Sequence, residues 1–212
     1  MTEINIQALW SSSDRGAWVA AFEHYWSFVK PTHQELERQM DSLDPERIRA
    51  MNADEWFEFL HKEYFRWKYT AANRYASTTK HLKLQVDECG VQQLHSFKDD
   101  IFQFAPTDVT AALKAAMQIR GLGTAGASGL LSLLFPALYG TVDQFVVKAL
   151  LQVPDLPERH QLERMNPEGL TVSQGVILIE IMQLKAQQLN VQFDSQEWTP
   201  RKVDMILWAV RE

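Results

Sequence analysis

The sequence predicts an all-α fold. Apolar residues recur at the i, i+3, i+4 spacing of helices, and the strict alternation typical of strands is scarce. Helix starts are also well marked, because small polar residues that can cap a helix precede most of the apolar runs.

The elements follow from these signals in chain order. Thr32–Glu35 and Asn52–Glu55 have the pattern of capping boxes. Asp44-Pro45 and Thr199-Pro200 each place a cap before a proline at the first helical position. We expect helices near 14–29, 32–41, 45–50, 53–68, 71–84, 91–103, 107–117, 124–134, 143–151, 158–164, 171–188 and 200–211.

Length and composition limit the class of protein. A chain of 212 residues forms one large domain or two small lobes. Cys89 is the only cysteine, which excludes an internal disulfide and an iron–sulfur cluster held by several cysteines of this chain. The first residues lack the pattern of a secretion signal, and the longest apolar run, 130–138, is too short to span a membrane. We therefore expect a cytoplasmic protein with no membrane contact, and we expect a monomer.

The charge is unevenly distributed. The whole chain carries −6, yet residues 61–84 contain six lysines and arginines against the single acid Glu63. Such a basic stripe can hold a phosphate backbone although the protein as a whole is acidic. A solvated helix face is the alternative interpretation of the same residues.

A Gly-x-Gly turn lies between two predicted helices. Gly121-Leu122-Gly123 can turn tightly and approach a ligand closely, because glycine has no Cβ. The helix that follows presents unpaired N-terminal amides, which suit an anion. Val142-Asp143 then opens a later helix.

This arrangement, from Ile119 to Leu150, resembles the helix-hairpin-helix DNA glycosylases. Their motif is a hydrophobic residue, a variable residue, Gly-hydrophobic-Gly, a helix, and a Val-Asp pair at the start of another helix. The family's optional hairpin lysine falls at Ala125, and Asp143 follows that position at the family's spacing of 18 residues. The resemblance covers about 35 residues. The single cysteine separates this chain from the branch that carries an iron–sulfur cluster.

The resemblance implies a two-lobed helical fold with a central cleft. Residues 53–135 would form the lobe that carries the hairpin, itself near 112–134. Residues 1–52 and 150–212 would form the second lobe. The segment 136–149 would place Asp143 at the cleft, where the base enters.

The resemblance also implies the chemistry. Hydrolysis of an N-glycosidic bond gives the sugar oxocarbenium character, and a fixed carboxylate stabilises that charge and orients the attacking water. Asp143 is the candidate catalytic residue, although aspartate is equally favoured as a plain helix N-cap. Ala125 cannot attack the sugar as a lysine would, so we expect a monofunctional hydrolase without lyase activity.

The hairpin and the basic stripe are the candidate phosphate contacts. Backbone amides of the hairpin would grip a phosphate of double-stranded DNA without reading its sequence. The candidates are Arg120, Gly121, Gly123, Thr124, Lys68 and Arg74. Arg120 stands where the family often has proline, and simple exposure is its alternative interpretation. The sequence implies no cofactor, although hairpins of this family sometimes hold a monovalent cation through backbone carbonyls. Its histidines lack zinc spacing.

Aromatic residues interleave with basic ones between Tyr64 and Tyr75. Flipped bases are held by stacking on aromatic faces, and an inserted side chain fills the space they leave in the duplex. Aromatic residues at helical spacing are more often core residues. For Trp208, which lies on an apolar helix, core packing is the favoured interpretation. The candidates for the base pocket or for intercalation are Trp67, Tyr69, Asn73, Tyr75 and Trp208.

The leading hypothesis is a DNA glycosylase that flips and excises a damaged or modified base and leaves an abasic site. The base could be a lesion of the cell's own DNA, in repair, or a modified base of foreign DNA, in antiviral defence. The second hypothesis is a helix-hairpin-helix module that binds DNA without catalysis. The third is a helical interaction protein with no role at nucleic acid.

Overall fold

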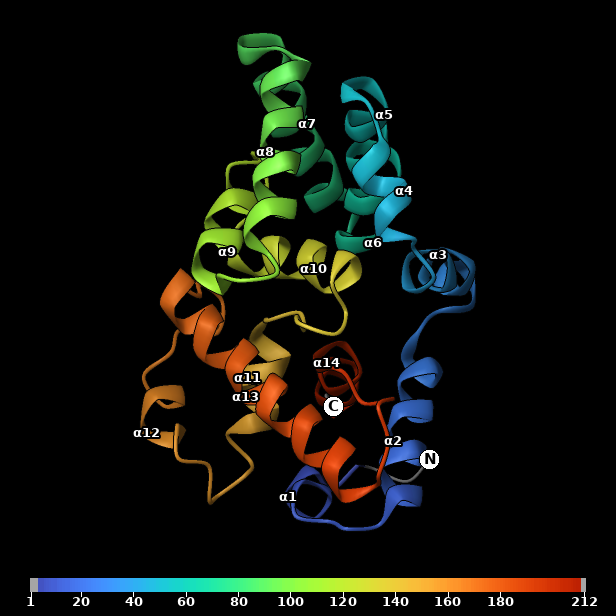
Figure 1. The fold of residues 1–212 in the computed structure, drawn as a ribbon, viewed down its shortest axis with the longest axis vertical. Coiled ribbons are helices and arrows are strands. Elements are labelled where there is room, and N and C mark those ends of the chain that lie inside the picture. The colour runs from blue at the N-terminus through green and yellow to red at the C-terminus, as the bar shows by residue number, and fades with distance from the viewer. Residues whose placement is uncertain (1–3, 211–212) are drawn as a thin grey trace. The chain divides into compact units, whose positions relative to one another are not determined.

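The computed structural model describes residues 4–210, and this part of the chain contains helices and no strands (Figure 1). The predicted all-α fold is therefore confirmed. The chain forms two compact units. Unit 1 combines residues 1–30 with 136–212, and unit 2 is the continuous segment 31–135. Between residues 4 and 210, no helix has the length and apolarity to cross a membrane.

Unit 2 is a helical bundle. Its elements are α3 (Pro31–Asp41), α4 (Pro45–Ala50), α5 (Ala53–Glu58), the π-helix η1 (Phe59–Tyr64), α6 (Phe65–Lys68), α7 (Ala72–Cys89), α8 (Val91–Phe104), α9 (Val109–Met117) and α10 (Thr124–Leu134). α8 packs against α5, α7 and α9, and α10 packs against α9. Large apolar side chains such as Trp56, Phe59 and Phe65 are buried in this unit.

Residues 31–52 belong to unit 2, whereas the sequence-based boundary separated them from residue 53 onward. α3 contacts η1 and α6, and α4 contacts α8 and α10. Met40 and Ile48 are each 1% exposed, and the Trp67 indole Nε1 donates a hydrogen bond to Glu37 Oε2 at 2.6 Å. These helices bury their apolar faces in unit 2. Their periodicity indicates which face is buried, but not which unit the face packs against.

Unit 1 joins the two ends of the described chain. Its helices are α1 (Ile6–Trp10), α2 (Arg15–Phe28), α11 (Gln144–Leu150), α12 (Arg159–Leu162), α13 (Val172–Gln192) and α14 (Pro200–Ala209). α14 packs against α2, α11 and the long α13 (orange in Figure 1). Tyr25 and Val29 meet Met205 and Ala209 in one apolar cluster, so the packing of α2 depends on α14.

In each unit, a buried lysine donates hydrogen bonds to backbone carbonyls at the C-terminal end of a short helix. Lys98 donates to Arg49 O at 2.7 Å and to Met51 O at the end of α4. Lys185 donates to Trp10 O at 2.9 Å at the end of α1, with its ammonium 4.6 Å from the centre of the Trp10 ring. Burial lowers the pKa of both lysines, and the carbonyl oxygens satisfy their donors.

Most predicted helix starts are confirmed, and four details differ. Asn52 forms its capping box, and Asp44 and Thr199 cap helices that begin with proline. The Thr32 capping box was wrong, because Pro31 is already the first residue of α3 and Thr32 lies inside the helix. The helix α1 was not predicted, α7 and α13 continue to Cys89 and Gln192, and the segment expected as one helix over 53–68 contains a π-helical section.

Candidate nucleic-acid interface

The predicted hairpin is present as α9, a turn over residues 118–123, and α10. Gly121 has φ +100°, a conformation that residues with a Cβ rarely adopt. A Cβ at this position would also lie 3.0 Å from the Thr78 carbonyl oxygen. Leu122 is buried, whereas Gly123 is exposed, and a Cβ there would meet nothing within 4 Å. The first glycine is thus required by the turn, and the second leaves open space at its surface.

Side chains from other helices hold the turn from inside. The Tyr69 hydroxyl donates to Gly121 O at 2.8 Å, and the Tyr64 hydroxyl donates to Gly126 O. Gln85 bridges the turn, because its Nε2 donates to Gln118 O at 2.7 Å and its Oε1 accepts from Arg120 N at 2.8 Å. These contacts occupy inward carbonyls. No cofactor is expected, and a monovalent cation of the kind that hairpins of this family sometimes hold would have to use the remaining carbonyls.

The outer end of the turn is the start of α10. Its N-cap is Gly123, which has no side chain that could accept the amides of the first helical turn. The Thr124 side chain points inward, with Oγ1 3.8 Å from Met117 Sδ. Such a helix start, with an exposed glycine before it, suits an anion.

The basic candidates near the hairpin differ in their availability. Arg120 is half-exposed, but its guanidinium lies 2.6 Å from Glu88 Oε2. Lys68 is half-buried against α10, close to Gly129, with its ammonium 5.8 Å from the Trp67 ring centre. Arg74 is exposed in the first turn of α7. Arg74 is therefore the most accessible of the three cations.

Asp143 caps α11 in unit 1. Its Oδ1 accepts hydrogen bonds from Phe145 N at 2.8 Å and Val146 N at 3.2 Å. The residue is partly exposed, and the two amides fix the orientation of its carboxylate. The capping interpretation is thus confirmed, and it is compatible with a catalytic role.

A buried ion pair holds the backbone that leads to Asp143. Asp204 Oδ2 accepts from Thr141 N at 2.8 Å and lies 3.0 Å from an Arg201 guanidinium nitrogen. Asp204 is 3% exposed and Arg201 5%. Burial raises the pKa of Asp204, and the nearby Asp143 charge adds to this, whereas Arg201 and the Thr141 amide favour the carboxylate.

The chain before Thr141 is also confined. Tyr139 is fully buried, and a Cβ at Gly140 would lie 2.7 Å from the Pro200 carbonyl oxygen and 2.6 Å from Met182 Sδ. The backbone that precedes α11 is therefore packed closely against α13 and α14 at Gly140. Sequence reasoning missed Asp204, although a lone acid among Val203, Met205 and Ile206 is a signal of a buried charge with a partner.

The aromatic candidates divide between packing and an open pocket. Trp67 packs on Tyr64 and bonds Glu37, and Trp208 packs 5.3 Å from Tyr25 and 6.3 Å from Phe145 between ring centres. Asn73 is exposed, and its side chain accepts from the Arg74 amide.

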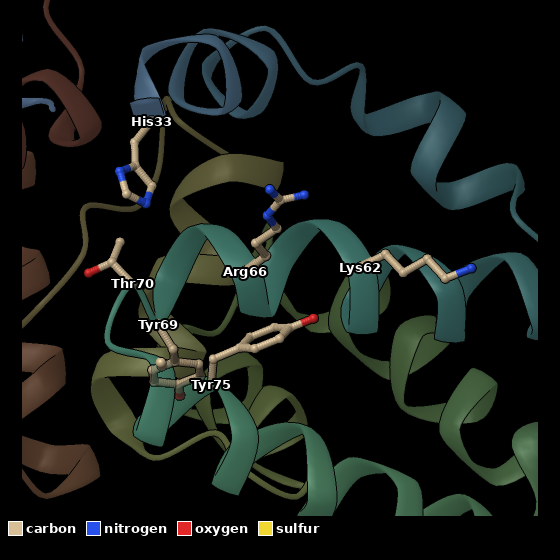
Figure 2. Close-up of a pocket in the computed structure, with 7 residues that line it drawn as sticks. His33, Lys62, Arg66, Tyr69, Thr70 and Tyr75 are labelled. Atoms are coloured by element: carbon tan, nitrogen blue, oxygen red, sulfur yellow. The ribbon is translucent and has the colours of Figure 1, made fainter. Parts of the chain in front are cut away.

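Tyr69 and Tyr75 line a cavity of about 470 Å³ in unit 2 (Figure 2). His33, Lys62, Arg66 and Thr70 complete its polar lining. Sequence reasoning placed Lys62 and Arg66 in the basic stripe but did not single them out, and it missed His33, which comes from α3.

Of the described histidine, cysteine and acidic side chains, no three are grouped as metal ligands. Comparison with protein-family models, with curated proteins and with solved structures finds no match in any of the three.

Proposed function

We propose that this chain is a monofunctional DNA glycosylase. The observation that carries the proposal is the partly exposed residue Asp143, whose carboxylate is fixed by backbone amides, in a chain that also contains a Gly-x-Gly hairpin held by side-chain hydrogen bonds. The hairpin offers the amides at the start of α10 to a phosphate of the DNA backbone. Asp143 offers a negative charge with one oxygen already oriented by two amides.

The reaction would be hydrolysis of the bond between the base and C1′ of deoxyribose. As that bond breaks, the electron pair leaves with the base and the sugar becomes oxocarbenium-like. Asp143 stabilises the cation and orients a water molecule, whose oxygen adds to C1′. One water proton remains on the new hydroxyl, and the other goes to solvent or to the departing base. Ala125 has no amine that could form a Schiff base, so the product is an abasic site in an uncut strand.

The test is base release by the protein and by Asp143→Asn. Asparagine keeps an oxygen that can cap α11, so the fold is retained while the charge is lost. Both proteins are incubated with duplexes bearing single lesions and with genomic DNA from cells and from viruses with modified bases. Freed bases are identified by mass spectrometry, and abasic sites are counted with an aldehyde-reactive probe.

We expect Asp143→Asn to lower base release by roughly 10²–10³-fold, the usual loss for one electrostatic stabiliser. Asp108→Asn is the matched control, because Asp108 also caps a helix, accepting from Ala111 N at 2.9 Å, and lies in unit 2. Equal activity of Asp143→Asn and the control would contradict the catalytic role.

The second candidate function is a DNA-binding module without catalysis. The observation that favours it is the N-cap geometry of Asp143, which by itself explains an aspartate at this position. This function predicts DNA affinity that falls steeply with salt, no base release from any substrate, and no effect of Asp143→Asn on binding.

A further inference from the structure

The cavity in unit 2 combines cationic and aromatic walls. Lys62 and Arg66 lie one helical turn apart in its lining. His33 of α3 lines the cavity as well, and Thr70 adds a hydroxyl (Figure 2). The cavity volume of about 470 Å³ falls in the range of small-molecule sites. The residues that line it include no carboxylate, so the site favours an anion.

Arg66 is the available cation of this site. Lys62 pairs with Glu58 one turn earlier on its own helix. Arg66 is exposed, and within residues 4–210 its side chain makes no ion pair or hydrogen bond. A guanidinium presents a planar fork of donors that matches the oxygens of a phosphate.

The π-helix η1 ends directly before α6, and Lys62 lies within it. π-helical sections are rare and are frequently found at functional sites. Here η1 is retained among buried side chains, with Phe59, Leu60 and Tyr64 each at most 1% exposed. Lys62 therefore projects from a firmly packed segment, and Arg66 from the helix α6 that directly continues it.

The tyrosines present rings instead of hydroxyls. Tyr75 donates its hydroxyl to His61 O at 3.2 Å, and Tyr69 donates its own to Gly121 O. Both rings are thereby held in place, and a planar ligand could stack on them with little loss of side-chain freedom. Burial raises the pKa of Tyr69 to about 12, so its hydroxyl stays a donor even above the pH at which an ordinary tyrosine ionises.

We propose that this cavity binds one nucleotide unit, with the phosphate on Arg66 and His33 and the base against the ring of Tyr75. Two sources supply this chemistry, an unpaired nucleotide of a DNA strand and a free nucleotide. The first source rests on the proposed function. Tyr69 belongs to this cavity and also holds Gly121, so the same side chain joins the nucleotide site to the hairpin turn.

The experiment uses the full chain labelled with 3-fluorotyrosine and followed by ¹⁹F NMR. Its five tyrosines give few signals, and Tyr69→Phe and Tyr75→Phe assign the two of interest. The probes are thymidine monophosphate, a short single-stranded oligothymidine, and inorganic phosphate. We expect the Tyr69 and Tyr75 signals to shift, and those of Tyr25 and Tyr139 in unit 1 to stay.

Arg66→Ala tests the phosphate contact. We expect it to weaken binding by about tenfold, the lower range for a hydrogen bond to a charged group, and to reduce the salt dependence of oligonucleotide binding by about one counterion. Arg47→Ala is the matched control, because Arg47 is an exposed arginine of α4 that does not line the cavity. Equal affinity of the two variants would overturn the proposal.

The probes separate the sources. Tight binding of oligothymidine alone supports a nucleotide within a strand, and equal binding of thymidine monophosphate supports a free nucleotide. Inorganic phosphate binding as tightly as both would overturn the aromatic half of the site. Base release without shifts of the tyrosine signals would overturn this inference and leave the glycosylase proposal standing. Shifts without base release would overturn the glycosylase proposal and leave this inference standing.

Discussion

The hairpin turn and the segment before Asp143 are both irregular backbone, but they are held in opposite ways. Neutral donors, the Tyr69 hydroxyl and the Gln85 amide, hold the turn in unit 2. A buried pair of opposite charges, Arg201 and Asp204, holds the segment in unit 1. Neutral hydrogen bonds each add little and fail gradually, whereas a buried charge that loses its partner is costly. The two regions should therefore respond differently to comparable changes.

The largest effect is expected from Asp204→Asn. The amide oxygen can still accept from Thr141 N, but Arg201 loses its counter-charge while it stays buried. We expect the free energy of unfolding to fall by about 3–5 kcal/mol at neutral pH, measured by urea denaturation. Adding Arg201→Met should restore part of the loss. If Asp204→Asn alone lowered the free energy of unfolding by less than Tyr69→Phe does, the contrast between the two regions would be wrong.

An intermediate effect is expected from Gly121→Ala. The positive φ and the nearby Thr78 carbonyl oxygen make a Cβ unfavourable, so we expect a loss of about 1–3 kcal/mol in the free energy of unfolding. Gly123→Ala is the control from the same turn. It has open space around it and should cost about 0.5 kcal/mol, because alanine is a poorer N-cap than glycine. Equal losses in thermal or urea unfolding would show that the turn does not depend on its first glycine.

The smallest effect at neutral pH is expected from Tyr69→Phe. It removes one hydrogen bond to Gly121 O and should cost about 1 kcal/mol. The sign of its pH dependence follows from the raised pKa. The pKa of the tyrosine is near its ordinary value of 10.0 in the unfolded chain and about 12 in the folded one, so the stabilisation is complete below the first value and is lost as pH rises through the second. Absorbance titration of the phenolate with urea unfolding at alkaline pH measures this. Identical alkaline profiles for both proteins would contradict it.

The sequence predicted local structure better than the site. Helix starts at Asp44, Asn52 and Thr199 were readable because a cap acts within three or four residues. The hairpin was readable because its glycines are local as well. The hydrogen bonds that hold the turn and the segment before Asp143 could not be predicted, since Tyr69 bonds a residue 52 positions later and Thr141 bonds one 63 positions later.

The same distinction explains the aromatic candidates. Trp67, Tyr69 and Tyr75 have the same sequence pattern, yet one bonds Glu37 and the other two line the cavity. The difference is made by α3, which supplies both Glu37 and His33. Which residues of the basic stripe face the cavity also depends on the π-helical section, which no local signal in 53–68 revealed.

The division of the chain has a consequence for its synthesis. Unit 2 is continuous, so every partner within it has been made once residue 135 has left the ribosome. Unit 1 is interrupted in the sequence by unit 2. The buried face of α2 packs on α14, which is made almost last. Since domains generally fold as units during translation, α2 must wait with Trp18 and Tyr25 uncovered while unit 2 folds. This early helix is where we expect a chaperone to be needed during translation.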